Sequence, residues 1–305
     1  MHSDTHALII GSDGFLGKNL GRILAARGWA LTRIDRAAGD LKNWDTVVAA
    51  FADLPLVDRI FHVVTRQRTG QGQFGIQGEM LAINARIHLN ILEAWRQFQP
   101  QAKLISTGSS CAYPECDTPL PEAAYQTGPL HPSVTGYGLA KQVLAIGAQS
   151  YAEQYGLEHL HCILATMFGP GDHHAPDRAH FVGGLLDRAV RERDAGETRF
   201  TVWGDPRTVR EVLYVDDQIE AILAADKAFK NQVLNCAVNQ PITVGEVATA
   251  VCTAIGWDAE TWSPPDSFSG AGYKVLDSSA FLKATGWAPQ VGLLEGLQRI
   301  YKLEH

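Results

Sequence analysis

Short apolar runs alternate with longer amphipathic segments over the first half of the chain. Residues 7–10, 29–34, 57–64, 103–106 and 159–165 are apolar runs of the length that predicts strands. Apolar residues recur at helical spacing over residues 17–27, 80–98 and 137–155. A strand–helix alternation of this kind predicts the α/β class, with a doubly wound parallel sheet covered by helices on both faces.

The pattern changes after Gly169, where turn-rich and polar segments interrupt the alternation. We therefore predict a nucleotide-binding domain over residues 1–168, to which residues 211–230 return. Residues 169–210 and 231–302 then form a smaller substrate-binding lobe. Residues 303–305 resemble the start of a purification tag and are expected to be a tag remnant.

A glycine-rich turn, Gly-Ser-Asp-Gly-Phe-Leu-Gly, joins the first predicted strand to the first predicted helix. Glycines at such a turn let backbone N–H groups approach a pyrophosphate at the positive end of the helix. The strand–turn–helix context favours a dinucleotide site over an ordinary glycine-rich turn. The cofactor-binding residues predicted here are Gly11, Asp13, Gly14, Phe15, Leu16 and Gly17.

The residues after the second strand bear on the choice of cofactor. Asp35 is positioned to accept hydrogen bonds from the adenosine ribose, which favours NAD, although its carboxylate is also suited to capping a turn. Arg36 would instead bind a 2′-phosphate, which leaves NADP open. Asp40 and Leu41 are expected to hold the adenine. Val63 and Val64, at the end of another strand, are expected beside the cofactor.

A Tyr-x-x-x-Lys pair, Tyr137 and Lys141, lies at the start of a predicted helix and therefore on one helix face. A neighbouring ammonium is expected to lower the pKa of the phenol. Such a tyrosine exchanges a proton with a sugar hydroxyl or ketone while hydride moves to or from a nicotinamide. Ser109, at the end of a predicted strand, is expected to hydrogen-bond the same oxygen.

Composition narrows the choice of ligand and compartment. The chain has 305 residues, a net charge of −7 and 19% charged residues, and it has no run of Lys or Arg that would suit a nucleic acid. It has no apolar stretch long enough to span a membrane and no signal-peptide pattern. The five cysteines form no paired framework, which favours a reduced, cytoplasmic setting.

Taken in order, these motifs resemble the extended short-chain dehydrogenases/reductases, the NAD-dependent epimerase/dehydratase family. They are most similar to the GDP-L-fucose synthases, which epimerise and reduce GDP-4-keto-6-deoxymannose. The matching segments are Ser-Ser-Cys-Ala-Tyr-Pro at 109–114, Tyr-Gly-Leu-Ala-Lys at 137–141, Phe-Gly-Pro-Gly-Asp at 168–172 and Val-Asp-Asp at 215–217. The resemblance covers nearly the whole chain.

The resemblance implies an acid–base pair for epimerisation. The family's cysteine lies two residues after the catalytic serine, which corresponds to Cys111, and its histidine corresponds to His180. A thiolate removes a proton beside a ketone, and an imidazolium returns one. From the residues alone, Cys111 would also suit a small buried filler, and His180 a phosphate contact or an ordinary loop histidine, although these are the less favoured alternatives.

The family pattern also implies a GDP-sugar site. Arg188, Arg210 and Lys274 are expected at the nucleotide diphosphate, although each also suits a surface cation. Trp203 is expected to pack on the nucleoside unless it is a core residue. Ser110 and Thr166 complete the expected substrate contacts. A homodimer through residues 80–98 and 137–155 is expected, because this fold commonly forms oligomers.

The chain departs from the family at three places. Thr166 replaces an asparagine, the segment 62–68 carries Arg66 and Arg68, and Asp-His-His at 172–174 replaces an asparagine-rich loop. Adjacent histidines without a third ligand predict no metal site. Two other hypotheses remain: an NAD-dependent nucleotide-sugar 4-epimerase or dehydratase that recycles its cofactor, and a non-catalytic dinucleotide-binding protein.

Overall fold

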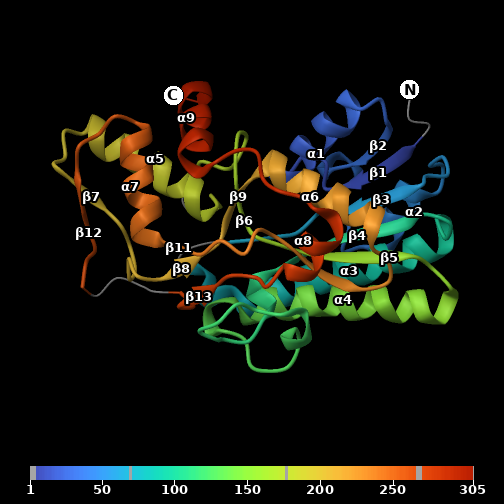
Figure 1. The fold of residues 1–305 in the computed structure, drawn as a ribbon. Coiled ribbons are helices and arrows are strands. Elements are labelled where there is room, and N and C mark those ends of the chain that lie inside the picture. Colours follow the sequence, from blue (N-terminus) through green and yellow to red (C-terminus); the bar gives the residue numbers. More distant parts are fainter. Residues whose placement is uncertain (1–4, 69–70, 176–177, 266–269, 305) are drawn as a thin grey trace.

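The computed structural model describes residues 5–68, 71–175, 178–265 and 270–304. A layered α/β domain occupies one side of the molecule, and a smaller lobe extends from it (Figure 1). In the part of the chain that the structure describes, no helix is long and apolar enough to cross a membrane.

The α/β domain is built on a six-stranded, wholly parallel sheet with the order β2-β1-β3-β4-β5-β10. Its strands are β1 (His6–Ile10), β2 (Ala30–Ile34), β3 (Arg59–His62), β4 (Lys103–Ser109), β5 (His159–Leu164) and β10 (Val233–Cys236). The chain runs outward from β1 to β2 and then crosses back to β3. The topological switch point therefore lies between β1 and β3, where ligands bind in open α/β sheets. The predicted fold class is confirmed.

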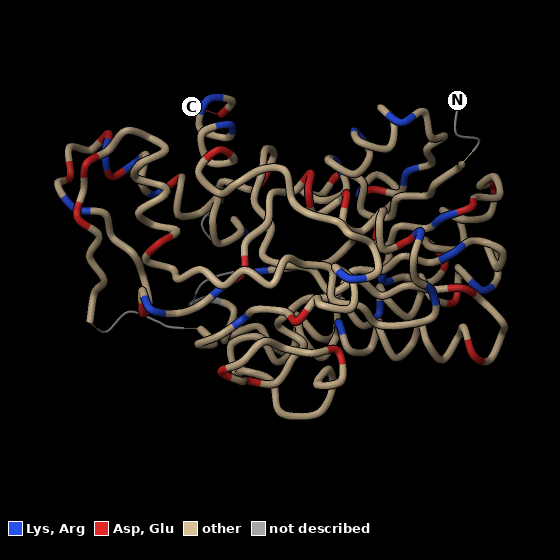
Figure 2. The backbone as a smooth tube through the Cα atoms, viewed as in Figure 1, with Lys and Arg blue, Asp and Glu red and all other residues tan. Residues whose placement is uncertain are grey.

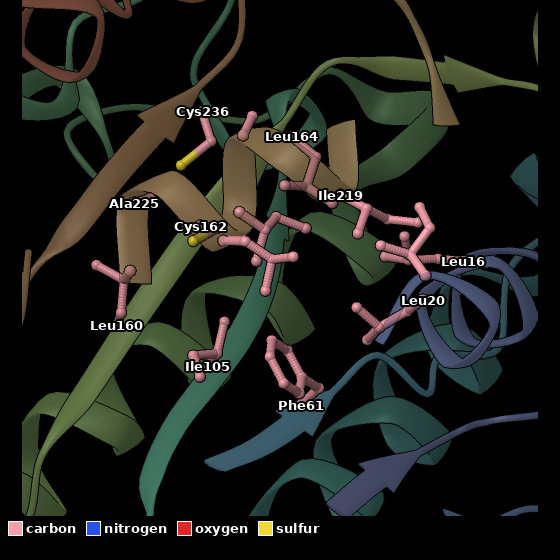
Figure 3. Close-up of a cluster of buried hydrophobic side chains, with 14 of the residues drawn as sticks. Leu16, Leu20, Phe61, Ile105, Leu160, Cys162, Leu164, Ile219, Ala225 and Cys236 are labelled. Atoms are coloured by element: carbon pink, nitrogen blue, oxygen red, sulfur yellow. The ribbon is translucent and has the colours of Figure 1, made fainter. Parts of the chain in front are cut away.

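Helices cover both faces of this sheet (Figure 1). Alternate residues of β1 supply the two resulting cores, because successive strand side chains point to opposite faces. Ala7 and Ile9 pack with α1 and α6, a core that Figure 3 shows, whereas Leu8 and Ile10 pack with α2, α3 and α4. The helices of the domain are α1 (Phe15–Ala26), α2 (Trp44–Phe51), α3 (Gln77–Phe98), α4 (Thr135–Tyr155), α6 (Val215–Ala228) and α8 (Ser279–Thr285).

The smaller lobe has a core of its own, in which Phe200, Val251 and Leu297 are fully buried. Its helices are α5 (Phe181–Asp194), α7 (Val244–Ala254) and α9 (Leu293–Glu304), and its short strands are β7 (Arg199–Thr201), β8 (Val209–Arg210), β11 (Ile242–Thr243), β12 (Glu260–Trp262) and β13 (Tyr273–Lys274). The paired strands β6 (Thr166–Phe168) and β9 (Val212–Tyr214) connect this lobe to the sheet domain. Three strands, β11-β8-β13, form the small sheet that faces the larger domain.

Two elements that were predicted to belong to the lobe, β10 and α8, belong instead to the sheet domain. Residues 231–302 were assigned to the lobe, but β10 pairs with β5 in the main sheet. Helix α8 also packs on the main domain, because its Phe281 is buried in the core beneath α6. Short elements of this kind contribute a few apolar residues each, and their spacing does not reveal which sheet they join.

Candidate active site

A single cavity of about 1190 Å³ opens at the carboxyl ends of the strands and continues to the lobe. Of the predicted site residues, Asp35 and Leu41 alone do not line it. Ten Lys or Arg side chains and four carboxylates stand among its described lining residues, in a chain whose net charge is negative. The cavity therefore suits an anionic ligand through a local cluster of cations.

The glycine turn fits a dinucleotide at close range. Gly11 has a φ of +92°, and a Cβ there would lie 2.7 Å from Val64 Cα. A Cβ on Gly17 would lie 2.1 Å from the carbonyl oxygen of Gly11. Helix α1 begins directly after Gly14, and no described side chain caps it. Its first N–H groups are therefore oriented towards the cavity edge as an anion site, with no acidic residue in the first turn.

The adenosine end of the cavity differs from the prediction. The Asp35 carboxylate accepts a hydrogen bond from the backbone N–H of Ala37 at 2.8 Å, so it caps a short turn. Arg36 lines the cavity and forms an ion pair with Asp13, while Asp40 pairs with Lys42 at 3.2 Å. Leu41 is buried in the core rather than set against an adenine site. Local capping and core packing thus engage Asp35 and Leu41, neither of which lines the cavity, and their expected cofactor contacts remain predictions.

Lys141 is held beneath the end of β4. Its side chain is almost completely buried, and Nζ donates a hydrogen bond to the carbonyl oxygen of Thr107 at 2.8 Å. Burial lowers the pKa of Lys141 to about 8, although the nearby Cys111 opposes that shift. Nζ lies 5.8 Å from the centre of the Tyr137 ring, one helical turn away. The spacing of Tyr137 and Lys141 on α4 therefore brings them together as predicted.

The pKa of Tyr137 is raised, contrary to the expected lowering. Burial is the largest cause and the charge of Cys111 adds to it, while hydrogen bonds with Ser109 and Thr65 oppose it. The ammonium of Lys141 binds Thr107 and does not offset these effects. A tyrosine in this environment holds its proton, so the free site is prepared to donate a proton to a ketone rather than to accept one from a hydroxyl.

Cys111 lies in the short 3₁₀ helix Ser110–Ala112 that follows β4. The Ser109 side chain starts this helix by accepting a hydrogen bond from the backbone N–H of Cys111 at 3.2 Å. Gly138 of α4 permits a close approach, because a Cβ there would lie 2.5 Å from the Cys111 carbonyl oxygen. Lys274 Nζ contacts Cys111 Sγ at 3.0 Å. Lys274 thus lines the cavity as expected and also contacts the thiol, and its contact with a diphosphate remains a prediction.

The environment of Cys111 favours its charged form. Burial would raise the pKa of the thiol, but the Lys274 ammonium, hydrogen bonds with Ser109 and Lys274 and the Arg210 guanidinium together bring it below its usual value. A thiol with a lowered pKa in a partly exposed, electropositive cavity is characteristic of a reactive cysteine. This geometry disfavours the alternative of a buried filler.

His180 also lines the cavity and lies directly before α5. Its Nδ1 is 2.6 Å from Asp172 Oδ1, and its backbone N–H donates to Asp172 Oδ2 at 3.1 Å. Its ring also packs against Phe15 of the glycine turn, with ring centres 5.3 Å apart. Because Asp172 engages Nδ1, proton transfer to a ligand falls to Nε2.

The lobe contributes an exposed aromatic platform. Trp203 is 63% exposed within the cavity wall, and the Arg188 guanidinium lies 4.0 Å from the centre of its ring. The alternative of a core tryptophan is thus contradicted. Arg210, Ser110 and Thr166 also line the cavity.

Three residues that position the side chains of the site were not predicted from the sequence. Thr65 hydrogen-bonds Tyr137, and Asn84 fixes the loop after β3 by accepting the Arg66 backbone N–H at 2.7 Å. Asp172 orients His180. The Gly-Pro-Gly-Asp motif contains the signal for Asp172, whereas Thr65 and Asn84 carry no local signal because their contacts are long-range.

Comparison with known proteins assigns the chain to a family. Residues 7–237 match the family described as NAD dependent epimerase/dehydratase family. The chain belongs to this family. Among curated relatives, "Probable GDP-L-fucose synthase 1" of Oryza sativa subsp. japonica is 28% identical over 303 residues, which is 96% of this chain and 90% of that protein.

Solved structures share the fold at lower identity. A GDP-6-OMe-4-keto-L-xylo-heptose reductase from C. jejuni superposes with a TM-score of 0.90 at 20% identity, covering 99% of this chain and 98% of that one. A GDP-L-fucose synthetase from Naegleria fowleri bound to NADP has a TM-score of 0.87 at 20% identity, covering 99% and 93%. The predicted resemblance is confirmed, as is the prediction of an NAD(P)-dependent enzyme. The preference for NAD over NADP is not supported.

In the described ranges, no group of three His, Cys, Asp or Glu side chains is arranged to hold a metal ion. The neighbouring histidines His173 and His174 have separate surroundings. His174 pairs with Asp187 at 3.0 Å, which is the largest cause of its raised pKa. The pKa of His173 is lowered, mainly by burial.

We predict that Gly17→Ala weakens binding of NADPH by at least about ten-fold, since the new methyl group overlaps the Gly11 carbonyl and displaces the turn. Gly78→Ala is the matched control, because no atom lies within 4 Å of a Cβ at that position. Fluorescence titration of both variants measures the change. Equal affinities for NADPH would show that the turn does not hold the cofactor.

We predict that Lys141 loses its proton near pH 8 in the free protein, because burial disfavours its ammonium form. NMR spectroscopy of ¹⁵N-lysine-labelled protein follows the Nζ resonance, and its loss in Lys141→Met assigns it. The ammonium is then present below pH 8 and disappears as the pH rises through that value. Titration near the ordinary lysine value of 10.5 would contradict the described environment.

Proposed function

We propose that the protein is an NAD(P)-dependent GDP-sugar epimerase/reductase that acts on a GDP-linked 4-keto sugar. The observation that carries this proposal is the convergence of Ser109, Tyr137, Lys141, Cys111 and His180 on one cavity with the glycine turn. Relatives that match at least 90% of this chain, from Oryza sativa and Escherichia coli, are named GDP-L-fucose synthase. Their names supply the nucleotide and the sugar class.

In this proposal Cys111 and His180 move protons at the carbons that flank the ketone. The Cys111 thiolate takes a proton from carbon, and the electron pair remains in the enolate of the substrate. His180 Nε2 returns a proton to carbon from the other side, while Asp172 keeps the ring oriented. The lowered pKa of Cys111 supports the assignment of the thiol as the base.

Tyr137 protonates the C4 oxygen in the reductive half of the reaction, and Ser109 hydrogen-bonds the same oxygen. The raised pKa of Tyr137 supports this direction, since a protonated phenol is the form that donates. A bound nicotinamide supplies the hydride. Lys141 orients the nicotinamide ribose and screens the negative charge that forms on Tyr137 after the proton is given.

NADP is the proposed cofactor. Arg36 and Lys42 line the cavity beyond β2, where a 2′-phosphate is expected, and the Asp35 carboxylate is engaged by Ala37 N–H. A guanidinium binds phosphate oxygens with two parallel hydrogen bonds. NADP or NADPH also appears in the titles of structurally similar proteins from C. jejuni and Naegleria fowleri.

The nucleotide end of the substrate is proposed to lie in the lobe. Trp203 offers an exposed ring for the guanine, and Arg188 stacks on it from the side of α5. Arg210 then reaches the diphosphate, and Ser110 and Thr166 contact the sugar.

A homodimer through α3 and α4 also remains a proposal. The two helices pack along one another, and Leu89 and Ile146 are about half exposed on them. Apolar side chains of this kind are suited to a symmetric interface between copies of the chain.

Incubation of the enzyme with GDP-4-keto-6-deoxymannose and NADPH in deuterated water tests the proposed function. We expect deuterium at both carbons flanking the ketone, together with stoichiometric oxidation of NADPH. Cys111→Ser is expected to lower deuterium incorporation by about 100-fold or more. Cys116→Ser, in the loop after the 3₁₀ helix, is the matched control.

The other outcomes separate the rival functions. Reduction without deuterium would leave a simple ketoreductase. Conversion of a nucleotide sugar without net oxidation of NADPH would indicate a 4-epimerase or dehydratase that recycles its cofactor. Tight cofactor binding with no turnover of any ketosugar would support a non-catalytic protein.

We further predict that Arg36→Ala raises KM for NADPH by about 10- to 100-fold while leaving KM for NADH unchanged, since a charged hydrogen bond contributes about 1.5–3 kcal/mol. Arg33→Ala on β2 is the matched control, because Arg33 does not line the cavity. Initial rates with each cofactor provide the measurement. An equal effect on NADPH and NADH would count against a 2′-phosphate at Arg36.

A further inference from the structure

Lys274 is set apart from the other cations of the cavity by its partner. Its Nζ lies 3.0 Å from Cys111 Sγ, across 163 positions of sequence. Lys274 on β13 lies directly opposite Arg210 on the adjacent parallel strand β8. Two adjacent cations repel one another unless an anion lies between or beside them. The thiol is the ionisable group that the fold brings to this pair.

The charged and titratable groups around Cys111 come from three directions. Lys274 and Arg210 face it from the small sheet of the lobe, while Tyr137 and Lys141 face it from α4. Ser109 hydrogen-bonds it from the end of β4. Three of the four ionisable neighbours are cations, and the fourth, Tyr137, holds its proton. This surrounding stabilises a negative sulfur.

We propose that Lys274 holds Cys111 as the thiolate, and that it is the positioning residue of the epimerisation base rather than a ligand of the substrate diphosphate. The assignment of Cys111 as the base rests on the proposed function, whereas the Lys274–Cys111 ion pair does not. In the resting protein Lys274 Nζ lies within hydrogen-bond distance of the Cys111 sulfur. The thiolate takes the proton of the substrate carbon, and Lys274 then remains as a cation beside a neutral thiol.

The placement of Lys274 also explains how the lobe is linked to the base. Cys111 is anchored on the sheet domain by Ser109 and by the close approach of Gly138. Lys274 belongs to β13, which pairs only with lobe strand β8 among the described strands. The thiol is therefore contacted where the two parts of the molecule meet.

Alkylation of the free enzyme tests the ion pair without any substrate. Iodoacetamide is added to the wild-type protein over a range of pH, and Cys111 modification is read by peptide mass spectrometry. An ordinary thiol has a pKa of about 8.5, and we expect the midpoint of Cys111 alkylation to lie below that pH. Lys274→Met should raise the midpoint and slow alkylation at pH 7 by about ten-fold for each pH unit of the shift. Lys274→Arg should retain most of the rate.

Lys283→Met is the matched control, because Lys283 is an exposed lysine on α8 that does not line the cavity. Should Lys274→Met fail to fold, the wild-type profile still decides: a midpoint at or above pH 8.5 overturns the proposal.

Steady-state kinetics and deuterium exchange separate the two roles of Lys274. The proposal predicts that Lys274→Met lowers kcat for exchange and moves its pH profile upward, with KM for the GDP-sugar little changed. A raised KM with an unchanged alkylation profile would instead make Lys274 a diphosphate ligand. If the wild-type protein turns over no GDP-sugar but the alkylation profile shifts as expected, the ion pair stands and the proposed substrate fails.

Discussion

The buried ammonium of Lys141 is the constraint around which the catalytic end of the cavity is arranged. An ion removed from water costs several kcal/mol unless it is paired or hydrogen-bonded, so the surrounding groups must suit it. The carbonyl oxygen of Thr107 accepts a hydrogen bond from Lys141 Nζ at 2.8 Å. Its charge also lowers the pKa of the buried His62 to about 3, after the larger effect of burial. The ammonium thus fixes α4 against the end of β4, and with it the position of Tyr137.

Burial has opposite consequences for the three titratable groups of the site. It keeps Tyr137 protonated and brings the pKa of Lys141 to about 8. At Cys111 the same effect is outweighed by Lys274 and Arg210. The site therefore presents a proton donor and a proton acceptor at once, which a reaction that both reduces a ketone and exchanges neighbouring protons requires. The two cations that produce this difference come from the lobe.

The distribution of charge explains how an acidic protein prepares an anion site. Lys, Arg, Asp and Glu are interspersed along the described parts of the chain (Figure 2). The cations gather instead on the cavity wall, where low dielectric strengthens their effect on a diphosphate. The net charge of −7 therefore argued against a nucleic acid but did not reveal the local cluster of cations.

Local patterns predicted the parts of the molecule that depend on local structure. The apolar runs identified five strands of the sheet, and helical spacing brought Tyr137 and Lys141 to one face. The sixth strand, β10, was assigned to the lobe, because a single short apolar run does not indicate which strand it pairs with. Asp35 was placed correctly at a strand end, but the sequence did not reveal that one of its carboxylate oxygens caps a local turn. The Lys274–Cys111 contact joins two domains and has no sequence signal at all.

A crystal structure of the enzyme with NADP and GDP would show whether one cavity holds the cofactor and the nucleotide sugar on either side of Tyr137. We expect the pyrophosphate of NADP at the N-terminus of α1, its 2′-phosphate at Arg36 and guanine on Trp203. We also expect Lys274 to remain on Cys111 while Arg210 meets the GDP phosphates. GDP bound outside the cavity, or NADP with its 2′-phosphate away from Arg36 and Lys42, would contradict this arrangement.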